Sequence, residues 1–276
     1  MTAHDLFHAG KLKDAIAAQV EEVRNHPTDT GLRLFLSELL CFAGDFERAD
    51  TQIDAMGHQD TKMLPFAMVY RHLIRAAQAR QDFYKVGRVP EFLGRPEGST
   101  RLLLEASVLL REGATVEAAE RRAQAEAESP KVSGMCDDQP FDDFRDLDDM
   151  TFAFFEVFTS KGEYYWIPID RVDLIEFKAP ERPRDLLWRP ARMVVRNGPD
   201  GEVYLPVLYP NLNTEIDESL RLGRTTEWLG GEGGTPVRGA GQRTFLVGEN
   251  AIPLMEMNTV TFDSPPGVAA ESSPGT

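Results

Sequence analysis

The chain has 276 residues, of which 42% are hydrophobic and 27% charged, so it is long enough for two domains and has a globular composition. Its formal net charge of −15 argues against binding to nucleic acid or anionic membranes, because both interactions require positive charge opposite phosphate. No apolar run reaches the roughly 20 residues that span a bilayer, and the N-terminus lacks a signal-peptide pattern, so we expect a cytoplasmic protein without membrane insertion.

A short phrase near the N-terminus repeats along the chain. Residues 10–15 (GKLKDA) return at residues 44–49 (GDFERA), with the glycine, the apolar residue and the alanine each 34 positions apart. The glycine, alanine and final proline recur with the same spacing at Gly113, Ala118 and Pro130, whereas a unit around residues 81–83 is out of phase. This period is typical of tetratricopeptide-like helical hairpins, which stack into a superhelix whose groove binds protein segments. Unrelated helical hairpins are the alternative, and they would also form a helical scaffold.

Apolar residues at helical spacing divide residues 1–130 into a series of expected helices. After the N-terminal turn, these helices cover approximately residues 12–23, 32–40, 46–56, 64–76, 83–92, 102–110 and 116–123.

An acidic segment follows the predicted helices. Residues 137–149 hold seven aspartates and one arginine. Carboxylates suit Ca²⁺ and Mg²⁺, and they are the basis of an alternative hypothesis of a carboxylate- or metal-dependent enzyme, but the segment lacks the spacing and glycine of a calcium loop. We therefore predict an acidic linker over residues 131–150, or a docking surface for arginines of the next domain.

Strand and turn patterns replace helical patterns after residue 150. Two hairpins are predicted, with strands at 155–159 and 164–167 and at 192–196 and 202–207, and later strands at 245–247 and 257–262. Frequent prolines favour a compact barrel or roll. The predicted fold class is thus multidomain α and β. It comprises a tetratricopeptide-like α-α superhelix (1–130), an acidic linker (131–150), a small β-rich α+β domain (151–262) and a disordered tail (263–276).

Motifs for catalysis or cofactor binding are weak. His4 and His8 have the i, i+4 spacing of metal ligands, but no glutamate or third ligand accompanies them. The glycine-rich segments at 230–234 and 239–242 lack the lysine and hydroxyl residue of a phosphate loop. No serine or cysteine nucleophile has a plausible base, since no histidine follows His72. We predict no catalytic residue, no cofactor and no metal.

Arginines are frequent in the second half despite its negative charge. We favour an internal ion-pair network with Asp170, Asp173, Asp185 and Glu227 over a site for an acidic ligand.

Five phrases in the second half have a recognisable order. They are GEYYWIP (162–168), RDLLWRPA (184–191), LPVLYP (205–210), LRLGRTTEW (220–228) and GAGQR (239–243). Together they resemble the ImpE family, also called TagJ or SciE-type virulence proteins. The residues that match, to which we assign structural roles, are Tyr165, Trp166, Pro168, Asp185, Leu186, Trp188, Tyr209, Pro210, Arg221, Gly223, Arg224, Glu227, Trp228, Gly241, Gln242 and Arg243.

The resemblance implies a non-enzymatic accessory component of the bacterial type VI secretion system. It implies as partner the small subunit of the contractile sheath, bound through its N-terminal helix, and indirectly the AAA+ ATPase that disassembles the sheath. A stacked-hairpin groove suits such an amphipathic helix, although the sequence does not show which face binds it. One departure is that residues 148–152 (DDMTF) lack the family's Gly-Pro turn. The alternative is a general scaffold or chaperone for another cytosolic partner.

Overall fold

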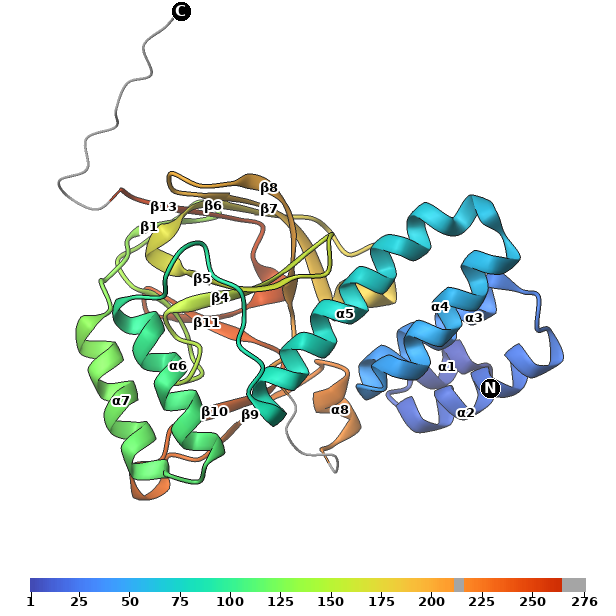
Figure 1. Cartoon of the computed structure of the whole chain (residues 1–276), viewed down its shortest axis with the longest axis horizontal. Helices are drawn as coiled ribbons and strands as arrows, with labels where there is room; N and C mark the ends of the chain where they lie inside the picture. The colour runs from blue at the N-terminus through green and yellow to red at the C-terminus, as the bar shows by residue number, and fades with distance from the viewer. Residues whose placement is uncertain (211–215, 265–276) are drawn as a thin grey trace, which may run out of the picture.

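The computed structural model describes residues 1–210 and 216–264 (Figure 1). Its N-terminal part begins with two helical hairpins, in which the repeated glycines end the first helix of each pair. Gly10 and Gly44 have left-handed φ angles of +82° and +75°, which glycine adopts without strain. Ala15 and Ala49 are fully buried where the helices approach. The helices are α1 (Ala3–His8), α2 (Leu12–Asn25), α3 (Thr30–Ala43) and α4 (Phe46–Gln59).

One long helix replaces two that were expected. After the short turn η1 (Thr61–Met63), α5 runs over Leu64–Val86 and ends at Gly87, whose φ is +83°. The predicted helix over 83–92 is therefore wrong. Residues 77–82 contain no glycine or proline to stop α5. The residues after Gly87 are not helical, and Glu91 is bridged to the sheet at Tyr165.

A third hairpin carries the last copy of the repeat. It consists of α6 (Gly98–Arg111) and α7 (Thr115–Glu128) around Gly113, whose φ is +81°. Figure 1 shows this hairpin beside the sheets and apart from α1–α4.

The C-terminal part is built from antiparallel sheets, so the predicted fold class is confirmed. The largest has eight strands in the order β2-β1-β13-β6-β7-β8-β4-β5, and β12-β11-β3 and β10-β9 form two smaller sheets. Both predicted hairpins are present, as β4–β5 and β7–β8. The strands are β1 (Gly134–Cys136), β2 (Gln139–Phe141), β3 (Phe144–Asp146), β4 (Phe154–Thr159), β5 (Tyr164–Pro168), β6 (Val172–Phe177), β7 (Trp188–Val195), β8 (Asp200–Pro206), β9 (Thr226–Leu229), β10 (Arg238–Gly241), β11 (Thr244–Val247), β12 (Asn250–Pro253) and β13 (Thr259–Phe262). Short helical turns accompany them: η2 (Ile169–Arg171), η3 (Pro183–Leu186), α8 (Glu218–Arg221), η4 (Glu232–Gly234) and η5 (Leu254–Glu256).

The segment 131–150 is not a linker, which corrects the expected domain boundaries. It contributes β1 and β2 to the large sheet and β3 to the three-stranded sheet. The apolar residues between the aspartates explain this, because Cys136, Phe141 and Phe144 are buried in the core of the β domain. Most of the expected tail, residues 265–276, lies outside the described residues.

The helices and the β domain share one hydrophobic core. It joins α1–α7 to Phe154, Phe158 and Trp166 of the sheet, while a second core lies within the β domain. On α3, every residue from Phe35 to Phe42 is buried. This happens because α2, α4 and η3 all pack against α3. The face of α3 that hairpin packing would leave free is therefore covered by the chain's own C-terminal domain.

Candidate functional site at the cleft between the helices and the sheet

A cleft of about 240 Å³ remains open where the two parts meet. Residues 41–44, at the end of α3, and Phe46, at the start of α4, form one wall, and the segment of α5 from Ala77 to Lys85 forms the base. The β domain contributes the opposite wall. Four of the matched family residues line this wall: Trp188, Tyr209, Pro210 and Arg221.

The base of the cleft is fixed by a buried carboxylate. Glu156, on β4, accepts hydrogen bonds from Arg80 Nε (3.0 Å) and Nη2 (2.6 Å) and from the Tyr84 hydroxyl (3.0 Å). Tyr164 and Arg243 also donate to Glu156, and Arg80 reaches the Leu208 carbonyl at 3.0 Å. One helix and two segments of the β domain are thus held by a single side chain.

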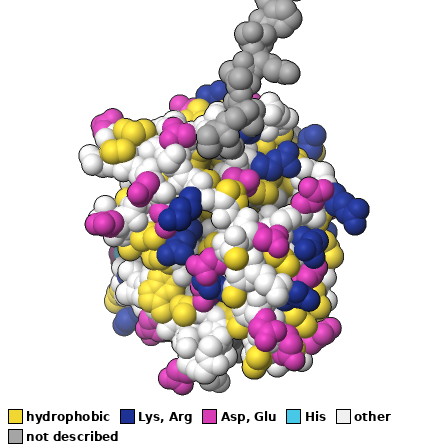
Figure 2. Space-filling view, turned by 90° about the vertical axis from the view of Figure 1, so that its left-hand side faces the viewer, with side chains coloured by type: hydrophobic (Ala, Val, Ile, Leu, Met, Phe, Trp, Pro, Cys, Tyr) yellow, Lys and Arg dark blue, Asp and Glu magenta, His cyan; other side chains and the backbone are white. Residues whose placement is uncertain are grey.

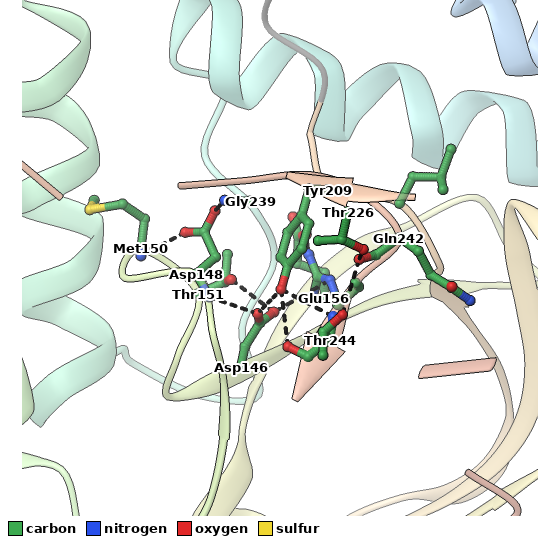
Figure 3. Close-up of polar contacts among 12 residues, drawn as sticks. Asp146, Asp148, Met150, Thr151, Glu156, Tyr209, Thr226, Gly239, Gln242 and Thr244 are labelled. Carbon is green, nitrogen blue, oxygen red and sulfur yellow. Dashed lines mark hydrogen bonds and ion pairs between the residues drawn. The ribbon is translucent and has the colours of Figure 1, made fainter. Parts of the chain in front are cut away.

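The network extends through the acidic segment (Figure 3). Asp146 lies 3.4 Å from Arg243 Nε and accepts hydrogen bonds from Thr151 Oγ1 (2.9 Å) and the Tyr209 hydroxyl (2.7 Å). Asp148 is paired at 3.0 Å with Arg238 Nε. Three buried carboxylates thus face three arginines, Arg80, Arg238 and Arg243, and their charges cancel.

The two acids next to Arg243 differ in proton affinity. Burial alone would raise the pKa of Glu156, but the charges of Arg80 and Arg243 outweigh it and hold that pKa at about 2. Burial raises the pKa of Asp146 to about 6, although Arg243 opposes the shift. Glu156 is therefore the carboxylate that stays ionised and holds the arginines.

A further buried acid, Glu38, lies at the contact between α3 and η3. Burial raises the pKa of Glu38 to about 7, against the charge of Arg184. The matched residue Asp185 holds η3 in place, since it accepts from the amides of Glu181 (3.0 Å) and Arg182 (3.1 Å).

Two matched arginines bind the carboxyl ends of helices. Arg224 Nη2 donates to the carbonyls of Phe7 (2.7 Å) and His8 (3.0 Å) at the end of α1. Arg221 Nη1 donates to the Ala43 carbonyl (3.2 Å) at the end of α3. Positive charge is favourable there because helix C-termini carry partial negative charge.

Most of the other matched residues shape the β domain. Trp166 stacks on Phe154 with ring centres 3.8 Å apart, and Trp188 packs edge-on against Tyr70. Gly241 has φ of +90° and leaves no space for a side chain beside the Thr225 carbonyl. Trp228 differs, since 43% of it is exposed and its ring packs edge-on against Tyr209.

The remaining matched positions lie on or next to strands and helical turns. Tyr165 and Pro168 are on β5, Leu186 is partly buried beside the shared core, and Gly223 has φ of +65° after α8. The backbone carbonyl of Gln242 accepts a hydrogen bond from Thr226 Oγ1 at 2.7 Å, while Glu227 is exposed on β9.

The arginine network forms with partners both expected and unexpected. Arg184 pairs with Asp185 and Arg196 with Asp173, as the sequence suggested, whereas no ion pair of Glu227 is found among the described residues. The acidic segment supplies the other partners through Asp146 and Asp148. This agrees with the expectation of a docking surface for arginines and not with a solvated linker.

Glu156, the acid at the centre of the network, is not identified from the sequence. Glu156 interrupts the apolar strand FFEVFT, and a lone charge within a buried strand is the signal that could have marked it. Among the described residues, no cluster of three or more His, Cys, Asp or Glu side chains is placed to hold a metal ion. No helix in the described part of the chain is long and apolar enough to cross a membrane.

Comparisons with known proteins agree with this architecture. Residues 138–261 match the family model described as ImpE protein. The type VI secretion system accessory component TagJ of Pseudomonas aeruginosa strain PAO1 is 34% identical over 95% of this chain and 92% of its own length. The crystal structure of protein VPA1032 from Vibrio parahaemolyticus superimposes with a TM-score of 0.88 at 29% identity, covering 95% of this chain and 98% of that one. The chain therefore belongs to the ImpE/TagJ family.

Proposed function

We propose that this protein is a non-enzymatic, cytoplasmic accessory component of a bacterial type VI secretion system. The support is the full-length similarity to the accessory component TagJ. We further propose that it binds the N-terminal helix of the small sheath subunit, and through the sheath influences disassembly by the AAA+ ATPase.

The cleft between α5 and the β domain is the surface that best suits a helix. Phe46, Leu208 and Pro210 offer apolar contacts, and Lys85 is an exposed cation at the edge. An amphipathic helix can insert successive apolar residues into such a cleft and place an acidic residue near the lysine. Because Glu156 fixes the base, little ordering of the protein is needed on binding.

The test is a titration of a fluorescent peptide, the N-terminal helix of the cognate small sheath subunit, followed by anisotropy. We expect saturable binding and a loss of about tenfold with Phe46→Ala, because truncating an apolar anchor typically costs more than 1 kcal/mol. Val116→Ala, at an exposed position of α7, is the matched control and should bind as the wild type.

Two results would contradict these proposals separately. Absence of binding even at low salt would argue against the sheath helix as partner. Binding that Phe46→Ala leaves unchanged would argue against the cleft as its site.

A further inference from the structure

A second opening lies on the other face of the large sheet. Along β4, Glu156 and Phe158 point towards the helices, whereas Val157 points into the core of the β domain, since successive strand residues alternate. On that side a pocket of about 340 Å³ opens between the β4–β5 and β7–β8 hairpins. The three-stranded sheet, which covers the core elsewhere, contributes no residue to its lining.

The depth of the pocket is apolar. Val157, Ile167, Met193 and Val195 are buried in the core of the β domain and form its inner walls. Gly201 adds open space, because a Cβ atom placed there would meet no atom within 4 Å. A cavity needs only about 10–15 Å³ to hold one water molecule, so this pocket is large enough for a bulky side chain.

The mouth of the pocket is acidic. Its charged lining residues are Glu163 and Glu202, both exposed, and Glu91 lies beside the mouth through its bridge to Tyr165. Glu202 is paired with Lys178, whereas Glu91 and Glu163 have no ion pair among the described residues. Partial burial, and then the charges of Glu163 and Glu91, raise the pKa of Tyr165, as expected beside a negative mouth.

We propose that this pocket receives an apolar side chain, of leucine to phenylalanine size, from a segment of a partner protein that carries lysine or arginine on both sides of it. The apolar side chain would occupy the depth between Val157 and Met193, and the cations would lie at Glu163 and Glu91. Charge complementarity selects this occupant, because no basic residue lines the pocket within the described chain. This inference is independent of the function proposed for the cleft.

The test uses the full chain labelled at its methionine methyl groups and observed by NMR. Met193 reports on the pocket, its signal being assigned with Met193→Leu, and Met68 on α5 is the internal reference. The probe is the tripeptide acetyl-Lys-Phe-Lys-amide. We expect a saturable shift of the Met193 methyl signal only, about fivefold weaker binding of acetyl-Glu-Phe-Glu-amide, and no shift with acetyl-Lys-Ser-Lys-amide.

Two variants separate the pocket from general effects. Gly201→Leu should abolish the shift because it fills the open space, and the unchanged signals of the other methionines would show that the variant is folded. Glu163→Gln, at an exposed position, should remove most of the preference for the lysine peptide without affecting folding.

Three outcomes would overturn the inference. They are equal binding of the glutamate and lysine peptides, an unmoved Met193 signal in the folded wild type, and hexylammonium alone matching the affinity of the lysine peptide, which would make the occupant a small amine. Phe46→Ala should leave all these results unchanged, so failure here and failure at the cleft are distinguishable.

Discussion

The same repeated phrase occurs in three hairpins, and the first two are attached to the rest of the molecule differently from the third. In the α1–α5 block, α3 buries every residue from Phe35 to Phe42, and α5 places Arg80 against the buried Glu156. In the α6–α7 hairpin, Leu102 and Leu103 of α6 reach the shared core, but α7 buries only Ala118 and Ala125. Two ion pairs, Arg122–Asp149 and Glu126–Arg145, join α7 to the β domain. The face of the molecule on the α7 side carries interspersed acidic and basic side chains (Figure 2). A repeat therefore specifies the hairpin, and the residues outside the phrase specify how firmly it is held.

The first test of this difference removes the charge at the centre of the firmer attachment. Glu156→Gln should lower the free energy of unfolding by about 3–5 kcal/mol, because it leaves the largely buried Arg80 without a counter-charge and Arg243 with Asp146 as its only acidic partner. Denaturant unfolding monitored by fluorescence measures the change. The control is Glu163→Gln, which replaces an exposed acid in the turn between β4 and β5 and should change stability by less than about 0.5 kcal/mol. A loss equal to that of the control would mean that the network does not hold the two parts together.

The second test creates equivalent cavities in the two regions. Leu39→Ala in α3 and Leu103→Ala in α6 both truncate fully buried side chains, so each should cost about 2–5 kcal/mol locally. Hydrogen exchange measures how far the effect spreads. Leu39→Ala should lower protection across α1–α5 and the sheet, whereas Leu103→Ala should lower it most in α6 and α7 and less in α5, which α6 contacts through the shared core. Equal loss of protection in α3 with both variants would show that the two regions unfold as one unit.

The same difference explains which features the sequence could predict. Local signals, such as the glycine at residue 44 and the turn between β4 and β5, determine the hairpins because turn conformation depends only on neighbouring residues. The covering of α3 by η3, and the pairing of Arg80 with Glu156, depend on contacts 76 or more residues apart along the chain. The acidic segment was misjudged for a related reason. Its aspartates suggested solvent, but Asp146 and Asp148 are buried against arginines almost one hundred residues later.

The third test uses pH. Glu38 has a folded pKa of about 7 and an ordinary value of 4.5, so between these values the folded protein binds a proton that the unfolded chain has lost. Stability therefore falls as pH rises through this window. Glu38→Gln should remove up to about 2–3 kcal/mol of that fall, since one pKa unit corresponds to about 1.4 kcal/mol. Unfolding curves at pH 5 and pH 8 measure the effect, and a variant with the wild-type pH dependence would contradict it.

The smallest expected effect concerns the weaker attachment. Arg122 on α7 donates to Asp149 Oδ1 at 2.6 Å and lies over the Phe152 ring, but it is partly exposed, so solvent screens its charge. Arg122→Ala should cost about 1 kcal/mol. Because that contact is one of two ion pairs that connect α7 to the β domain, hydrogen exchange should accelerate in α6 and α7 while α3 stays protected. Arg121→Ala is the matched control, since the Arg121 side chain contacts Glu105 and Gln124 within the hairpin itself. If both variants accelerate exchange equally, the hairpin is limited by its own stability and not by its attachment to the β domain.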